Sequence, residues 1–247
     1  MIFDPFGNFD TAGYLQNTLQ LKEPEEVKRA EHLAFEASIE TAFNYLAQTE
    51  TIDYQSVLKV HEILFSDFYP WAGKDRNELV PHLAVFKGSQ DNPRHTVFER
   101  PESIRMVVEY ALHLANNKLR FRERPGEVMG LLAFAHPFLD GNGRTILLVF
   151  MELAFRAGFT IDWSKTHKND YLRVLSDEIG EPSKKHLDRY LKPFVLSIVN
   201  RDAWPAIIGG IKGLDGLDKE NISYESLEDP EVQKIYMTYR SENQSNQ

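Results

Sequence analysis

Apolar residues recur at helical spacing along most of this chain, and the polar intervals between them are short. In residues 25–48, for example, Phe35, Ile39, Phe43 and Leu46 form one stripe that would bury against a core. The same spacing predicts helices in 52–68, 102–116, 128–135, 146–155 and 183–200, and another through Tyr171 and Leu175. The pattern predicts an all-α, mostly helical fold class.

One interval, residues 75–100, departs from this pattern. Val85, Phe86, Lys87 and Gly88 form a short β-prone run, and residues 95–98 form a second one. The polar residues 89–94 separate the two runs and have a suitable length for a hairpin loop. The sequence therefore predicts one small β-hairpin at about residues 84–98.

Glycine and proline divide the chain into three parts. Residues 1–24 look like an irregular lead-in, and Pro24 is suited to open the first helix. Residues 25–200 are predicted to form one domain. Residues 201–221 carry four glycines and one proline, which is typical of a linker, and residues 201–247 as a whole are expected to be a linker and a helical tail.

The composition narrows the class of protein. Of the 247 residues, 42% are hydrophobic and 26% charged, as in ordinary globular proteins. The net charge of −9 argues against nucleic-acid binding, which requires a basic surface. With no cysteine, neither a disulfide nor a thiolate metal site is expected. No apolar run approaches the ~18 residues of a membrane span, and the N-terminus lacks the features of a secretory signal. We expect a cytoplasmic protein without a membrane partner; a protein exported as an effector would have the same composition.

The richest stretch of polar chemistry is residues 136–144, between two predicted helices. Pro137 disfavours helix at His136, and Gly141 and Gly143 permit a tight turn. The predicted geometry is a helix, a short loop and a second helix whose first N–H groups attract anions. A single histidine or an Asp-Gly-Asn-Gly turn is usually structural. Here, however, every polar residue suits one phosphate site.

Each of these residues has a chemical role in such a site. The backbone around Gly141 and Gly143 can hold a phosphate chain, and the Arg144 guanidinium matches phosphate oxygens. The Asp140 carboxylate suits a Mg²⁺ that also binds phosphate oxygens. An imidazole ordinarily titrates near neutral pH, which makes His136 the natural general base for a hydroxyl. The stretch therefore predicts attack by a hydroxyl on a nucleotide phosphate.

Residues 136–144 resemble the signature of the Fic-domain family, His-x-Phe-x-Asp/Glu-Gly-Asn-Gly-Arg-x-x-Arg. The resemblance implies a mostly helical Fic fold and a nucleotidyltransferase that moves AMP from ATP to a hydroxyl of a target protein. It also implies that His136 is the general base and that Asp140 binds Mg²⁺. The phosphates would be held by Gly141, Asn142, Gly143 and Arg144.

The last arginine of the signature is replaced by Leu147. In the family that arginine holds the γ-phosphate of ATP. The related Doc branch also lacks it and transfers the γ-phosphate, as a kinase does, although Doc proteins usually have lysine where this chain has Gly143. Beside AMP transfer, the sequence thus leaves open a Doc-like phosphate transfer, another nucleotide donor, and nucleotide binding without turnover.

Three further segments resemble parts of Fic proteins. Tyr69 and Trp71 lie in a segment similar to Phe-x-x-x-Tyr-x-Trp-Ala-Gly, where we expect structural roles. The predicted hairpin is similar to the family's flap, which implies that the run from Val85 to Gly88 docks the target protein by strand addition. Residues 238–243 resemble the autoinhibitory pattern Ser/Thr-x-x-x-Glu-Gly/Asn, which implies an inhibitory role for Glu242. A separate antitoxin-type inhibitor is the alternative.

Overall fold

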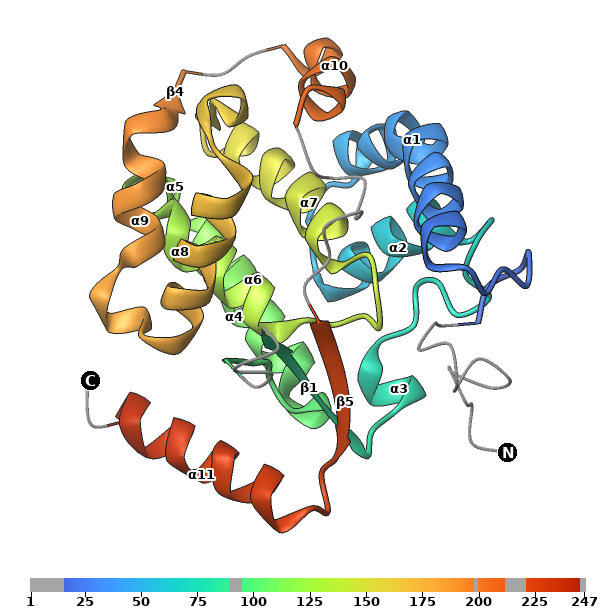
Figure 1. Ribbon diagram of the computed structural model, residues 1–247. Coiled ribbons are helices and arrows are strands. Elements are labelled where there is room, and N and C mark those ends of the chain that lie inside the picture. The colour runs from blue at the N-terminus through green and yellow to red at the C-terminus, as the bar shows by residue number, and fades with distance from the viewer. Residues whose placement is uncertain (1–15, 89–94, 198–199, 212–220, 245–247) are drawn as a thin grey trace.

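The computed structural model describes residues 16–88, 95–197, 200–211 and 221–244. Helices dominate it, so the predicted mostly helical fold is confirmed (Figure 1). The helices are α1 (Pro24–Gln48), α2 (Tyr54–Phe65), α3 (Arg76–Leu79), α4 (Ile104–Asn116), α5 (Lys118–Glu123), α6 (Pro125–Ala135), α7 (Asn142–Arg156), α8 (Lys168–Gly180), α9 (His186–Leu191), α10 (Trp204–Gly209) and α11 (Pro230–Gln244). The strands are β1 (Leu83–Gly88), β2 (Thr96–Val97), β3 (Thr160–Ile161), β4 (Val195–Leu196) and β5 (Asn221–Ser226).

Helix α7 lies at the centre of the fold (Figure 1). Every residue from Arg144 to Ala154 is buried, although the sequence pattern suggested a helix with a single apolar stripe. The reason is that α1 and α2 pack on α7 from one side while α5 and α6 pack on it from another. Because neighbouring helices cover α7 on several sides, all of its faces are buried and not one stripe alone. Its position brings the α6–α7 loop into the interior of the molecule.

Strand β1 is the middle strand of a three-stranded antiparallel sheet with the order β2-β1-β5. The pairing of β1 with β2, in which Phe86 lies opposite Val97, confirms the predicted hairpin. The hairpin loop, residues 89–94, lies outside the described residues. Strand β5 was not predicted. It pairs with β1 over six residues although more than a hundred residues separate the two strands in the chain.

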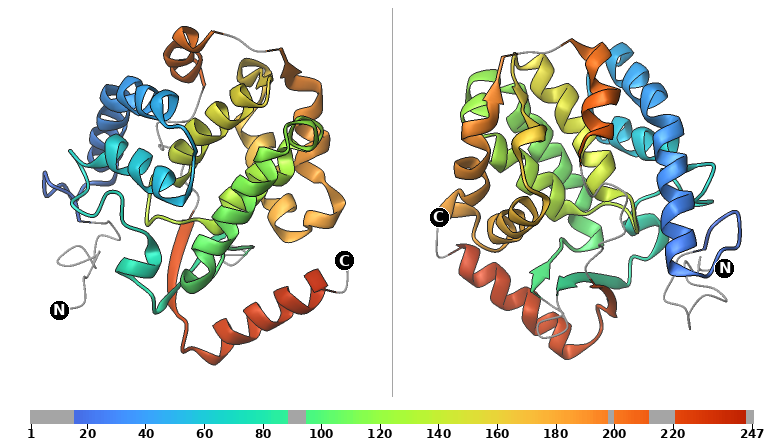
Figure 2. Two further views of the ribbon diagram at one scale, coloured as in Figure 1. Left: turned by 180° about the vertical axis from the view of Figure 1, so that it is seen from behind. Right: turned by 45° about the horizontal axis from the view of Figure 1, so that its top comes forward.

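The two faces of this sheet are covered by different elements. Helix α11 packs against Ala84 and Phe86 through Val232 and Tyr236. The opposite face, which includes Val85 and Tyr224, packs toward α8 and the centre of the fold, with the residues Val85, Phe98, Ile179, Ile222 and Tyr224 in contact. Figures 1 and 2 show α11 at the end of the molecule that lies furthest from α10. The C-terminal segment β5-α11 is therefore part of the sheet region.

The structure differs from the expected linker at residues 201–211. Helix α10 packs onto the helical core, and the Trp204 side chain is 1% exposed. Its ring centroid lies 4.7 Å from that of Phe43 and 5.5 Å from that of Phe155. The glycines that suggested a linker, Gly209 and Gly210, stand at the end of this short helix. Burial of a tryptophan outweighs the local preference of glycine for irregular structure.

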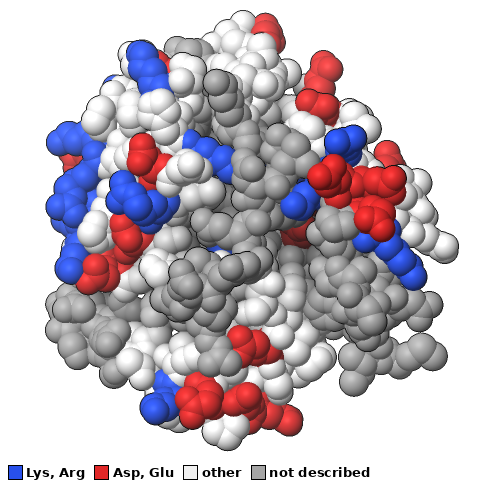
Figure 3. Space-filling view, in the orientation of Figure 1, with Lys and Arg blue, Asp and Glu red and all other residues white. Residues whose placement is uncertain are grey.

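The described surface carries both signs of charge. Among the described residues of the face in Figure 3, basic and acidic side chains are mixed. Within the described ranges, no helix combines the length and the apolar character that crossing a membrane would require.

Candidate active site

His136 lies where α6 ends and the loop to α7 begins. Its backbone adopts the left-handed conformation, with φ 42° and ψ 60°, and ends the helix before Pro137. This conformation costs ~1 kcal/mol or more for a residue with a Cβ atom and is typical of functional sites. The imidazole is 9% exposed and stacks on Phe98 with ring centroids 3.8 Å apart. The stacking fixes the ring of the predicted general base.

Arg76, which the sequence analysis did not single out, holds the backbone of this turn. Its Nε donates to the His136 carbonyl at 2.7 Å. A terminal nitrogen donates to the carbonyls of Glu99 at 2.7 Å and Ala135 at 3.3 Å. Its backbone N–H donates to the Pro137 carbonyl at 2.7 Å. Burial lowers the pKa of Arg76 to about 10, so the guanidinium stays charged at neutral pH and faces the negative end of α6.

Two reciprocal hydrogen bonds close the loop after His136. The Phe138 N–H donates to Asn142 Oδ1 at 2.9 Å, and Asn142 Nδ2 donates to the Phe138 carbonyl at 2.8 Å. The Asn142 side chain, which was predicted to hold phosphate, is thus used within the loop. A phosphate contact from this residue would come from its backbone N–H at the start of α7.

His61 supports the same loop from α2. Its Nδ1 accepts a hydrogen bond from the Gly73 N–H at 2.9 Å, so Nε2 carries the proton of the neutral ring and donates to the Asp140 carbonyl at 3.0 Å. The ring stacks on Phe138 with centroids 3.8 Å apart. Burial lowers the pKa of His61 to about 3. These contacts give His61 a structural role.

We expect the buried His61 to make stability depend on pH. Below about pH 6.5 the unfolded chain binds a proton at this histidine, whereas the folded state does so only near pH 3. The folded-state pKa is depressed, so this stability is present above pH ~6.5 and is lost as the pH falls, by up to ~1.4 kcal/mol per pH unit. Urea unfolding of the wild type and of His61→Asn, between about pH 6.5 and 4.5, measures the difference. If the free energy of unfolding depended on pH equally in the two proteins, this account would be contradicted.

A cavity of about 710 Å³ opens beside the loop, and its wall includes His136, Asp140 and the first residues of α7. Its size is typical of a small-molecule site. Gly141 has φ 75°, and a Cβ atom there would lie 2.5 Å from the Phe65 ring, so the turn requires glycine. At Gly143 a Cβ atom would meet nothing within 4 Å, so packing does not explain this glycine. Without a side chain, Gly143 lets a phosphate approach the first N–H groups of α7.

Asp140 stands at the wall of this cavity. One carboxylate oxygen accepts from the Gly141 N–H at 2.6 Å, and the other accepts from the Tyr69 hydroxyl at 3.4 Å. Within the described part of the chain, no three His, Asp or Glu side chains gather into a metal cage. Mg²⁺ is usually held by one or two carboxylates together with substrate phosphates. A single carboxylate beside a phosphate site fits this ion.

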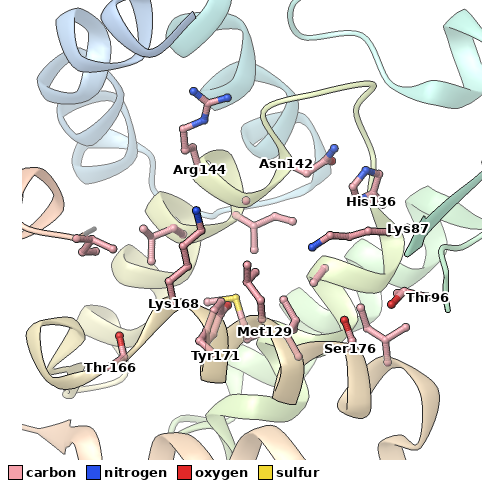
Figure 4. A pocket seen from close by; sticks show the side chains of 18 of the residues that line it. Lys87, Thr96, Met129, His136, Asn142, Arg144, Thr166, Lys168, Tyr171 and Ser176 are labelled. Carbon is pink, nitrogen blue, oxygen red and sulfur yellow. The ribbon is translucent and has the colours of Figure 1, made fainter. Parts of the chain in front are cut away.

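Arg144 also lines the cavity, but its guanidinium is held by another side chain. The guanidinium is 5% exposed and points away from Lys87 and Lys168 (Figure 4). It forms an ion pair with Glu31 of α1 at 2.5 Å and lies 4.8 Å from the centroid of the Phe65 ring. The predicted contact with phosphates would therefore require the guanidinium to turn away from Glu31.

The sequence did contain a signal for this ion pair. Glu31 lies four residues after Val27 and four before Phe35, on the stripe that α1 buries. A carboxylate in such a stripe requires a partner, because an isolated buried charge is costly. The pattern could not identify Arg144 as that partner.

Two lysines supply positive charge to the cavity. Lys87 comes from β1, and Lys168 is the first residue of α8; both line the cavity and extend into it (Figure 4). Lys168 was missed in the sequence. A lysine at the first residue of a helix is disfavoured by the helix dipole. An anion bound in the cavity would offset this cost.

The remaining predicted residues fall on the flap and in the tail. Val85 and Phe86 pack on opposite faces of the sheet, and of the four residues from Val85 to Gly88 it is Lys87 that lines the cavity. Glu242 falls within α11, but its side chain lies outside the described residues. Its inhibitory role stays a prediction.

Comparison with known proteins connects this geometry to a family. The model of the Fic/DOC family matches residues 51–154. The chain is 31% identical over 184 residues to protein adenylyltransferase VbhT of Bartonella schoenbuchensis, in an alignment that covers 69% of this chain and 35% of VbhT. It is 28% identical over 165 residues to Probable protein adenylyltransferase y4lH of Sinorhizobium fredii, covering 65% of this chain and 81% of that protein.

Solved structures share the fold. The BepC effector of Bartonella tribocorum, with bound AMPPNP, aligns with a TM-score of 0.60 at 18% identity over 78% of this chain and 98% of that one. The N-terminal Fic domain of a VirB-translocated Bep effector of Bartonella quintana, with bound ADP, aligns with a TM-score of 0.63 at 21% identity over 78% of this chain and 97% of that one. The chain therefore contains a Fic/DOC domain, which the family model places at residues 51–154.

Proposed function

We propose that this protein is a protein adenylyltransferase that transfers AMP from ATP to a hydroxyl of a target protein. The observation that carries the proposal is the position of His136 and the N-terminus of α7 on the wall of one cavity. Attack by a hydroxyl on a phosphate needs a base and a phosphate site in this arrangement. Two relatives named as protein adenylyltransferases, and Fic folds solved with AMPPNP or ADP, support the choice of donor.

The reaction follows from the groups on the cavity wall. The first N–H groups of α7, including that of Gly143, hold phosphate oxygens. The target hydroxyl gives its proton to the His136 imidazole while its oxygen bonds to the α-phosphorus. The bond from the α-phosphorus to the bridging oxygen of the β-phosphate breaks, and pyrophosphate leaves. A Mg²⁺ held by Asp140 and the phosphates would supply further positive charge. Positioning and charge stabilisation provide most of the rate.

ATP labelled separately at the α- or the γ-phosphate tests this proposal in a cell lysate that supplies target proteins. Protein labelled from the α-phosphate supports AMP transfer. Protein labelled only from the γ-phosphate would contradict it and support Doc-like phosphate transfer. Leu147 favours that alternative because the Doc branch also lacks the last arginine of the signature, and Gly143 opposes it. No label from either donor would contradict both reactions.

Lys168 is expected to bind the outer phosphates of the nucleotide. Replacing it by alanine should weaken ATP binding ~10-fold and AMP binding much less, because AMP lacks those phosphates. Titration calorimetry with ATP and AMP measures both affinities. Lys165→Ala is the control, since that ammonium pairs with Asp162 at 2.8 Å and does not line the cavity. Equal losses for ATP and AMP, or a similar loss in the control, would argue against this role.

A further inference from the structure

Strand β1 of the flap has a strand partner on each main-chain edge: two of its residues pair with β2, and all six pair with β5. Strand β2 pairs with one edge, and β5 pairs with the other from Leu83 opposite Ser226 to Gly88 opposite Asn221. Strand addition by another protein requires an open main-chain edge. On β1, the chain's own C-terminal strand occupies the position that an added strand would take.

The two faces of β5 have different surroundings. Ile222 and Tyr224 lie on the face that packs toward the centre of the fold. Side chains alternate along a strand, so Ser223 and Glu225 lie on the other face, where Ser223 Oγ donates to Glu225 Oε1 at 3.2 Å. Of the residues on the inner face, Ile222 lines the same cavity as His136.

The register fixes where Ile222 enters this cavity. Ile222 lies directly opposite Lys87 of β1. Opposite residues of an antiparallel pair project to the same side of the sheet, with Cβ atoms ~4.5–5.5 Å apart. Lys87 extends into the cavity from the flap (Figure 4). Ile222 is therefore the residue that β5 presents to the site of phosphate chemistry.

Side-chain hydrogen bonds hold β5 and α11 in place. The Tyr224 hydroxyl donates to the Leu139 carbonyl of the active-site loop at 2.7 Å. The Tyr236 hydroxyl of α11 donates to the Phe98 carbonyl at 2.8 Å. Burial raises the pKa of Tyr224, so its hydroxyl keeps its proton and remains a donor. On the inner face of β5, Tyr224 thus uses its hydroxyl as a fixed donor, and Ile222 has no hydroxyl.

We propose that β5 occupies the position of the target, and that the target is an extended segment running antiparallel to β1 with its acceptor hydroxyl at the position of Ile222. This inference rests on the proposed AMP transfer. Because Ile222 has no hydroxyl, β5 fills the position without accepting AMP. A target segment has to displace β5 before transfer, so the C-terminal segment limits access to the active site.

A hydroxyl introduced at position 222 tests the inference directly. Its oxygen would bond to the α-phosphorus of ATP, its proton would pass to His136, and pyrophosphate would leave. The cavity of about 710 Å³ remains open with β5 in place, so the nucleotide has room to bind. A group held on the same chain reacts with an effective concentration in the millimolar range or above. The rate of modification should therefore be independent of protein concentration.

The experiment compares Ile222→Thr with Ile222→Val in the full chain, using ATP labelled at the α-phosphate and peptide mapping of the product. These two replacements are β-branched and nearly equal in size, and they differ in the hydroxyl. We expect AMP at position 222 of Ile222→Thr to exceed the background signal of Ile222→Val, which has no acceptor there, by at least ~100-fold. Adding His136→Ala should abolish this modification. Glu225→Thr, on the other face of β5, should accept none. Ile222→Tyr is the second variant in case Ile222→Thr does not fold.

The outcomes separate the inference from the proposed function. AMP at position 222, at a rate independent of protein concentration, supports both. AMP on lysate proteins from the wild type, with none at position 222 in folded Ile222→Thr or Ile222→Tyr, overturns the inference and leaves the proposed function in place. AMP on Ser223 or Tyr224 of the wild type would overturn the assignment of position 222. No AMP on any protein in any variant overturns the proposed function, and the inference with it.

Discussion

Replacing His136 by alanine is expected to reduce the rate of AMP transfer by about 10²–10⁴-fold, the usual contribution of a general base. The imidazole lies on the cavity wall, where we propose that it takes the proton from the attacking hydroxyl. ATP affinity should change little, because the proposed phosphate contacts come from the backbone of α7 and from lysine side chains. Incorporation of the α-phosphate into protein measures the first effect, and titration calorimetry with ATP measures the second.

The site offers reasons to expect that this variant folds. Arg76 hydrogen bonds to the backbone carbonyl of His136, and the loop is closed by Phe138 and Asn142, so none of these contacts involves the imidazole. His113→Ala, on the exposed side of α4, is the matched control and should transfer AMP at the wild-type rate. Undiminished transfer by a folded His136→Ala protein would disprove the role of His136 as the base.

Replacing Glu31 by glutamine is expected to lower the free energy of unfolding by about 3 kcal/mol. The substitution keeps the shape of the side chain but removes the charge that faces the Arg144 guanidinium. Arg144 is 5% exposed and sits against the ring of Phe65, so its charge would remain buried without a carboxylate in the pair. Urea unfolding measures the loss as a lower midpoint at an unchanged slope.

A second glutamate on the same helix provides the control. Glu25 pairs with Arg29 at 3.5 Å, but both side chains are more than two-thirds exposed. Glu25→Gln should therefore change the unfolding free energy by no more than ~0.5 kcal/mol. Equal, small effects of the two substitutions would show that the buried pair contributes little. If saturating ATP restores most of the stability lost in Glu31→Gln, the predicted contact between Arg144 and the phosphates gains support.

The sequence by itself determined the elements that rest on local physics. Helical spacing of apolar residues predicted α6 and α7, and the alternation of polar and β-prone runs predicted the β1–β2 hairpin. Pro137 and the glycines of the loop predicted the end of one helix and the anion-attracting start of the next. His136, Asp140, Gly141 and Gly143 could be grouped because they lie within eight residues and so remain close together in any fold that keeps the turn.

Only the tertiary structure determined which distant residues and strands these local elements contact. Arg76 reaches carbonyls at the end of α6, Glu31 takes the guanidinium of Arg144, and Lys168 enters the cavity from α8. Strand β5 joins β1 from the far end of the chain and brings Ile222 to the active site. The position of Glu31 on the buried stripe of α1 shows that it needs a partner, but the sequence identifies none of these partners. Each pairing joins groups far apart in the chain through burial and hydrogen bonding that only the packed fold creates. The motif thus predicted a phosphate site, whereas long-range packing determined which charged side chains and which strand lie beside it.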